Sequence, residues 1–155
     1  MHFYMMEKLN FPEFNVLIKN KENKSYIFDP VRKIWLFFTP EEWVRVHCIF
    51  YLIEIKKYPA SLMRIEKELR LYNTKKRFDI LVAGLNLKPL ILVECKAPSV
   101  KINQKTFDQI IRYNLELKCA YLMVTNGLNH YFCDMNLEKN KISFIKELPN
   151  YKIDP

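Results

Sequence analysis

Glycine is scarce in this chain of 155 residues, and its scarcity excludes one large class of enzymes. Only Gly84 and Gly127 are present, so the sequence holds no GxxxxGK(S/T) phosphate-binding loop and predicts no ATP-driven motor. No apolar run approaches the roughly 20 residues that span a bilayer, and the first ten residues do not resemble a signal peptide. We therefore expect a cytoplasmic protein with no membrane partner.

Paired cysteine motifs are also missing. Cys48, Cys95, Cys119 and Cys133 show neither CxxC nor paired zinc-ligand spacing, and we interpret them as small buried residues in a reducing compartment. Half of the residues are hydrophobic and 14% are aromatic, which excludes a disordered chain. No repeat or linker divides the sequence, so one hydrophobic core is expected.

Positive charge is abundant, with a formal net charge of +8. This charge suits a polyanionic partner, and nucleic acid is the first candidate. The most basic run, Lys75, Lys76 and Arg77, lies directly before the segment that contains Asp79. We expect these three residues to contact phosphate, although runs of like charge are more often solvated faces.

The N-terminal quarter predicts a hairpin followed by a helix. Short strands at 14–19 and 26–35 flank a polar turn at 20–24, and Asp29-Pro30 interrupts the second strand. Thr39 is the predicted N-cap of a helix that runs to about residue 57, and Glu42 closes a capping box. We expect residues 1–38 to pack as an extension on a core of residues 39–155, within a single structural domain.

The rest of the chain alternates between strands and one further helix. The predicted elements are a strand at 62–72 with one polar face, strands at 78–83 and 90–96, a helix at 103–118, a strand at 120–124, a turn at Asn126-Gly127, and a hairpin of 130–135 with 142–145. This order predicts an α/β domain built on a mixed sheet.

Three charges interrupt the two central strands, where apolar residues would pack at lower cost. They are Asp79, Glu94 and Lys96. A buried lone charge is costly, so such groups must be paired, hydrated or bound to metal. In an antiparallel hairpin that pairs Ala83 with Leu90, Leu81 faces Leu92 and Asp79 faces Glu94. Strand alternation places Lys96 on the same face as Glu94.

Two opposed carboxylates repel each other, and a divalent cation removes that penalty. Mg²⁺ typically uses one or two carboxylates plus substrate phosphate, which matches Asp79 and Glu94. Lys96 could orient or deprotonate the attacking water and neutralise charge on the phosphate. The alternative is that Lys96 and Arg77 neutralise the two acids as a structural ion network. We favour phosphodiester hydrolysis, because all three charges fall on one predicted face.

Several motifs resemble those of one nuclease family. They are Phe28–Lys33, Thr39–Arg45, Lys76–Ile80, Val93–Pro98, Gln109–Asn114 and Val124–Gly127. Together they resemble the N-terminal nuclease domain of type I restriction enzyme R subunits, in a small stand-alone form. Asp79 with Glu94-x-Lys96 resembles the D…(D/E)xK signature of the restriction-endonuclease-like PD-(D/E)XK superfamily.

This resemblance implies a fold and an activity. The fold is a restriction-endonuclease-like core of helix, three-strand meander, helix and strand. The activity is Mg²⁺-dependent cleavage of DNA, of restriction or DNA-processing type, with Mn²⁺ as a substitute and with Asp79, Glu94 and Lys96 as catalytic residues. Glu66 matches a family glutamate and is the first choice for an additional metal ligand, ahead of Glu68 and Glu42.

The helix after the signature adds further candidates. Gln109 matches a glutamine that supports the active site or contacts DNA in such nucleases, and a solvated helix position is nearly as good an explanation. Tyr113 lies four residues later and can share its face. We include Tyr113 and Arg112 among the predicted DNA-binding residues.

Other functions stay open at this stage. The chain could be a nucleic-acid-binding or assembly module that keeps a nuclease-like fold without catalysis, or it could act on RNA. Without a motor it either cuts DNA unaided or depends on a protein partner for targeting. A homodimer would cut both strands of a duplex most easily.

Overall fold

The centre of the molecule is a six-stranded mixed sheet. The structure, a computed structural model, describes residues 6–71, 74–139 and 141–152. The strands are β4 (Met63–Leu71), β5 (Thr74–Ala83), β6 (Pro89–Cys95), β7 (Tyr121–Thr125), β8 (His130–Asn136) and β9 (Lys141–Ile145), in that spatial order. Only β6 and β7 pair in parallel among them. The predicted order of helices and strands along the chain after residue 39 is confirmed. Tyr72 and Asn140, in a predicted strand and turn, lie outside the described residues.

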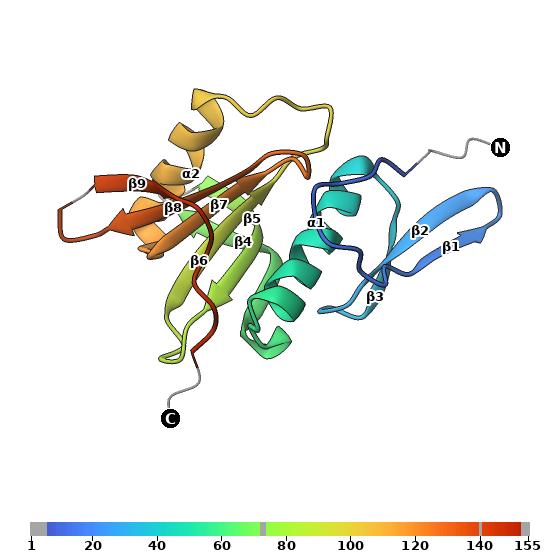
Figure 1. The fold of residues 1–155 in the computed structure, drawn as a ribbon, viewed down its shortest axis with the longest axis horizontal. Helices are drawn as coiled ribbons and strands as arrows, with labels where there is room; N and C mark the ends of the chain where they lie inside the picture. The colour runs from blue at the N-terminus through green and yellow to red at the C-terminus, as the bar shows by residue number, and fades with distance from the viewer. Residues whose placement is uncertain (1–5, 72–73, 140, 153–155) are drawn as a thin grey trace.

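One helix covers each face of this sheet (Figure 1). Helix α1 (Pro40–Phe50) continues as a π-helical turn over Tyr51–Ile55, and a 3₁₀ turn at Ala60–Leu62 leads into β4. Helix α2 (Gln104–Leu117) connects the parallel pair β6 and β7. Alternation along β6 separates the two cores, because Ile91 and Val93 pack with α1 while Leu92 packs with α2.

Local side-chain bonds set the start of each helix. The Thr39 hydroxyl accepts the backbone N–H of Glu42 at 3.0 Å, which confirms the predicted N-cap. The Asn103 side chain caps α2 in the same way through the N–H of Thr106. The Glu42 carboxylate, expected to complete a capping box, instead contacts Arg45 one turn along the helix.

The N-terminal segment forms three strands, so the predicted hairpin was wrong in strand number. They are β1 (Ile18–Lys21), β2 (Lys24–Asp29) and β3 (Ile34–Phe37), in a small antiparallel sheet that projects beyond α1 (Figure 1). Glu22 and Asn23 both have positive φ, as a two-residue hairpin turn requires. The Asp29 carboxylate accepts the N–H groups of Val31 and Arg32, and so builds the turn into β3.

The register of β5 and β6 agrees with the prediction in part. Leu81 pairs with Leu92 as expected, but Ala83 pairs with Pro89 rather than Leu90. The reason is a shift in register between Val82 and Ala83, which adds a residue at the β6 end of the hairpin. This irregularity lies at the turn, so it does not displace the strand ends that carry the candidate residues.

Candidate active site

An open cavity of about 420 Å³ lies between the start of α1 and strands β4, β5 and β6. The residues that line it are Thr39, Glu41, Glu42, Arg45, Glu66, Arg77, Asp79 and Glu94. Five of these carry a carboxylate. The cavity therefore brings together four predicted residues, Asp79, Glu94, Glu66 and Arg77, with several that were not predicted to act.

An interruption between β4 and β5 directs two of these acids toward α1. Paired residues flank the gap, Ile65 with Ile80 and Lys67 with Phe78, while Glu66 has a positive φ of 49°. Phe78 and Ile80 belong to opposite cores although they are two residues apart, which regular alternation would not allow. The regular alternation of β5 is therefore broken opposite Glu66. The Asp79 carboxylate lies on the α1 side of the sheet, where it contacts Arg45.

Two groups hold the Asp79 carboxylate in place. Its Oδ2 accepts the backbone N–H of Cys95 at 2.7 Å, and its Oδ1 accepts from Arg45 Nη2 at 2.9 Å. The regular pairs of β5 with β6 extend only to Ile80 and Val93. The predicted ladder pair of Asp79 with Glu94 is therefore replaced by a bond from the Asp79 side chain to the β6 backbone.

Arg45 occupies the centre of the cluster. Its side chain is only 4% exposed, and it contacts Asp79, Glu41 at 3.1 Å, Glu66 at 2.5 Å, and Glu42. Burial alone would lower the pKa of Arg45, but the surrounding carboxylates outweigh burial and raise it. Arg45 is thus a permanent cation that compensates several partly buried acids.

Glu94 and Lys96 form an ion pair at the β6 end of the cluster. Lys96 Nζ lies 3.1 Å from Glu94 Oε1. Burial and the nearby Asp79 raise the pKa of Glu94 to about 7, although Lys96 opposes the shift. Burial would lower the pKa of Lys96, but Glu94, Asp79 and Glu41 together raise it. Near neutral pH, Glu94 is thus poised to gain or lose a proton while Lys96 stays an ammonium.

Glu66 lies among three arginines. It contacts Arg77 from the neighbouring strand, Arg45 from α1, and Arg32 Nη1 at 3.6 Å. Burial would raise the pKa of Glu66, but these cations lower it. Arg32 also donates from Nε to the buried Asp29 at 2.7 Å. A continuous chain of ion pairs therefore joins the small N-terminal sheet to the cavity.

Gln109 and most of the predicted DNA-binding residues lie outside the cavity. Gln109 is exposed on α2 and donates to Tyr113 Oη at 2.7 Å, so the two share a helix face, but neither lines the cavity. Lys76 Nζ lies 5.2 Å from the centre of the Tyr113 ring. Lys75 and Arg112 are exposed, whereas Arg77 borders the cavity. The predicted group is therefore split between the cavity and the α2 side of the sheet.

Sequence reasoning missed Arg45 and Glu41. A usable signal was present, because an arginine between Val44 and Val46 falls within the apolar stretch of an amphipathic helix. Glu41 and Glu42, at four and three residues before it, are at the spacings where helical ion pairs form. A cation at such a position predicts a buried anionic partner from another element.

The sequence motif implies a Mg²⁺ ion, and the carboxylates of the cavity can be compared with the ligands that this ion takes. Within residues 6–71, 74–139 and 141–152, no three Asp, Glu, His or Cys side chains are arranged together as metal ligands. Asp79 and Glu94 are nevertheless adjacent, and Mg²⁺ commonly takes only one or two carboxylates beside water and phosphate oxygens. The chemistry of this pair fits such an ion.

A family model, the type I restriction enzyme R protein N terminus, matches residues 40–149. This match spans α1 to the segment after β9 and includes every acid that lines the cavity. The chain belongs to this family. The small sheet β1 to β3 lies outside the matched range.

A solved structure is similar in fold to this R protein N-terminal domain. It is a fragment described as the HsdR subunit of a type I restriction enzyme from Vibrio vulnificus YJ016, with a TM-score of 0.54 and 16% sequence identity. The similarity covers 73% of this chain and 24% of that one. The predicted restriction-endonuclease-like α/β fold is thereby confirmed. No curated protein matches the chain, and no helix in its described part is long and apolar enough to cross a membrane.

Proposed function

We propose that this chain is a metal-dependent nuclease that hydrolyses phosphodiester bonds in DNA, in a cytoplasmic restriction or DNA-processing role. The observation that carries the proposal is the meeting of Asp79 and Glu94 beside Lys96, with the pKa of Glu94 raised to about 7. Two acids held this close store electrostatic repulsion, which a divalent cation would relieve. A protein that bound no metal would have no chemical need to hold the Asp79 and Glu94 carboxylates together.

The residues around the acids supply positioning. The Cys95 N–H and Arg45 fix both oxygens of Asp79, so the carboxylate would not need to reorganise when its ligand arrives. Arg77 is 63% exposed at the rim and can contact a phosphate next to the scissile one. When bound, Mg²⁺ would polarise the scissile phosphate and acidify a water molecule.

Lys96 has an electrostatic role in this proposal. Because its neighbours raise its pKa, Lys96 is an ammonium near neutral pH and does not accept a proton from water. It can instead donate hydrogen bonds to the attacking water or to a phosphate oxygen and neutralise the charge that develops there. Of the two roles expected from the sequence, the raised pKa of Lys96 thus favours orientation over deprotonation.

The proposal is tested by cleavage of labelled single-stranded, duplex and branched DNA with Mg²⁺, Mn²⁺ or EDTA. We expect cleavage only with metal, and we expect Asp79→Asn, Glu94→Gln and Lys96→Ala each to reduce it by at least about 100-fold. Asp134→Asn and Lys101→Ala, which change exposed residues of the same types outside the cavity, should cut normally. Failure of the pure wild-type chain to cut any of these substrates with either metal would refute the proposal.

A second candidate is a nucleic-acid-binding or assembly module that retains the fold without catalysis. It is favoured by one observation, namely that each acid already has a cation: Asp79 pairs with Arg45, Glu94 with Lys96, and Glu66 with Arg77. Thermal unfolding with and without Mn²⁺ separates the two functions. A nuclease site should be stabilised by Mn²⁺ in the wild type but not in Asp79→Asn, whereas a purely structural ion network should show no stabilisation in either.

A further inference from the structure

The small N-terminal sheet has one face made only of lysine and aromatic side chains. Strand alternation and the pairing of β1, β2 and β3 place seven residues on it: Lys19, Lys21, Lys24, Tyr26, Phe28, Trp35 and Phe37. We call this set the Lys-aromatic face. A random surface would mix in acids and small polar residues, so this composition calls for an explanation.

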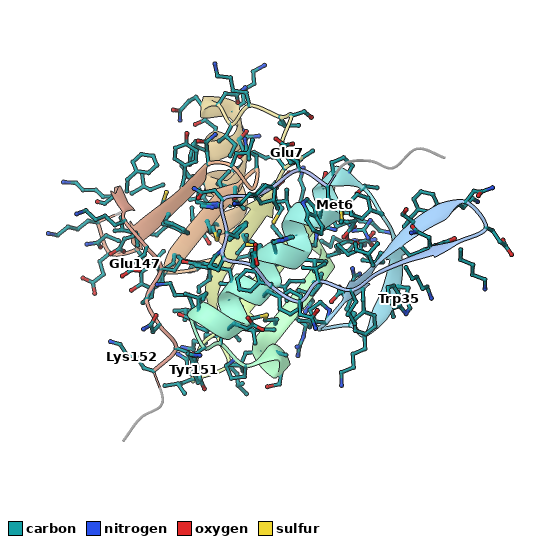
Figure 2. All side chains as sticks on the ribbon, turned by 45° about the vertical axis from the view of Figure 1, so that its right-hand side comes forward. Met6, Glu7, Trp35, Glu147, Tyr151 and Lys152 are labelled. Atoms are coloured by element: carbon teal, nitrogen blue, oxygen red, sulfur yellow. The ribbon has the colours of Figure 1, made fainter. Side chains whose placement is uncertain are left out.

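The rings and ammonium groups of this face are in direct contact. Lys19 Nζ lies 4.3 Å from the centre of the Trp35 ring, and Lys24 Nζ lies 5.9 Å from that of Phe37. Trp35 and Phe28 pack with ring centres 5.2 Å apart. Phe37 is 56% exposed and Trp35 38%, so both rings are accessible to a ligand. Figure 2 shows Trp35 on the projecting sheet.

The opposite face of the same sheet anchors it to the rest of the molecule. Ile27 and Asp29 on that face are completely buried, and Asp29 holds Arg32, which reaches Glu66 in the cavity. Glu22, in the turn between β1 and β2, lies outside the seven residues. The Lys-aromatic face is therefore free of acids and is held at a fixed position relative to the cavity.

We propose that the Lys-aromatic face binds single-stranded nucleic acid. Exposed aromatic rings give unpaired bases a surface on which to stack, and the lysines between them neutralise the phosphates. Paired bases in a duplex are already stacked on each other, so exposed rings that offer stacking favour unpaired strands. The proposal does not depend on the nuclease activity, because it concerns residues outside the cavity and a binding step alone.

Fluorescence anisotropy with labelled oligonucleotides tests this inference. The probe is oligo(dT) of about 20 nucleotides, longer than the roughly 4–16 nucleotides that a single-strand-binding module covers. EDTA in the buffer prevents cleavage. We expect Trp35→Ala and Phe37→Ala each to weaken binding by about tenfold or more. Lys24→Ala should lower the dependence of log K on log salt by about 0.7.

Two controls separate stacking from charge and from loss of folding. An abasic strand of the same length keeps the phosphates but lacks the bases, and should bind the wild type at least as weakly as oligo(dT) binds Trp35→Ala. Phe144→Ala removes a ring of β9 that is 66% exposed and should bind normally. Because EDTA removes any metal, binding is measured apart from cleavage, so that a failure of the nuclease proposal and a failure of this one are distinguishable.

Other nucleic acids test which kind of strand the Lys-aromatic face binds. We expect duplex DNA to bind at least tenfold more weakly than oligo(dT), and oligo(U) of the same length decides whether the face accepts RNA as well. Unchanged affinity in a Trp35→Ala, Phe37→Ala double variant would overturn the proposal. So would tight binding of the abasic strand, or a wild-type chain that dimerises through these rings and has no affinity for oligo(dT).

Discussion

Two regions of this molecule carry positive charge in opposite settings. In the cavity, Arg45 is 4% exposed and lies among carboxylates, while on the Lys-aromatic face Lys19 is exposed and lies over the Trp35 ring. Burial makes an unpaired charge costly, so every cavity cation is matched and its geometry is fixed before a ligand arrives. Exposure removes that requirement, and the lysines keep their charge available for an external anion. The cations of the cavity are neutralised by its acids, whereas the lysines of the Lys-aromatic face have no acid beside them on that face.

The largest effect on stability is expected at Arg45. Arg45→Ala leaves Glu42, Glu66 and Asp79 without their shared cation, and removal of one partner from a buried ion pair typically costs 3–5 kcal/mol. We expect the free energy of unfolding in urea to fall by about that amount. Arg112→Ala, an exposed arginine on α2, should change it by less than about 0.5 kcal/mol. Equal effects of the two substitutions would show that the buried network contributes no special stability.

The pH dependence of stability gives the next largest effect. Folded Glu94 keeps its proton up to about pH 7, whereas the unfolded chain loses it near the ordinary value of 4.5. Between these values Glu94 binds more protons in the folded state, so its contribution to stability falls as the pH rises through this window. The contribution of Glu94 is full below about pH 4.5 and is lost above about pH 7, by up to about 3 kcal/mol.

Glu94→Gln should remove most of this slope. Chemical denaturation of the metal-free chain from pH 4.5 to 8 measures it directly. The variant is expected to show a much flatter curve than the wild type, and Glu138→Gln, an exposed glutamate outside the cavity, should keep the wild-type slope. Equal slopes for the wild type and Glu94→Gln in this window would contradict the assigned environment of Glu94.

The smallest effect on stability is expected on the Lys-aromatic face. Lys19→Ala removes an exposed cation that lies over the Trp35 and Tyr26 rings, which should cost less than about 0.5 kcal/mol of unfolding free energy while weakening oligonucleotide binding. Thermal unfolding measures the first quantity and anisotropy the second. A destabilisation close to that of Arg45→Ala would mean that Lys19 serves folding, and the contrast between the two regions would fail.

Sequence patterns predicted the central elements well because local rules govern them. The Thr39 cap, the pairing of Leu81 with Leu92 and the order of strands after α1 follow from spacing and turn residues. The N-terminal strand number was wrong because Asp29-Pro30 was interpreted as a break within one strand. In the structure, Asp29 uses its side chain to build a turn between two strands, and a linear pattern does not record that bond.

The cavity was predictable only in part, for a physical reason. Asp79, Glu94 and Lys96 stand out as charges within apolar strands, and this pattern predicted that they meet, although the ladder pair of Asp79 with Glu94 does not form. Arg45 pairs with Asp79 from a different element, and its role depends on how α1 packs against the sheet. The interruption at Glu66, which directs Asp79 toward Arg45, arises from a positive φ that no local motif announces. Long-range partners of this kind require the three-dimensional arrangement.

Calorimetric titration of the metal-free chain with Mn²⁺ tests the central claim that Asp79 and Glu94 form a metal site. At about pH 6, below the pKa of about 7 for Glu94, ion binding should displace a proton. The measured heat should therefore change with the ionisation enthalpy of the buffer. We predict binding with proton release in the wild type and no binding in Asp79→Asn. Absence of binding in the wild type, or binding that Asp79→Asn leaves unchanged, would contradict the account.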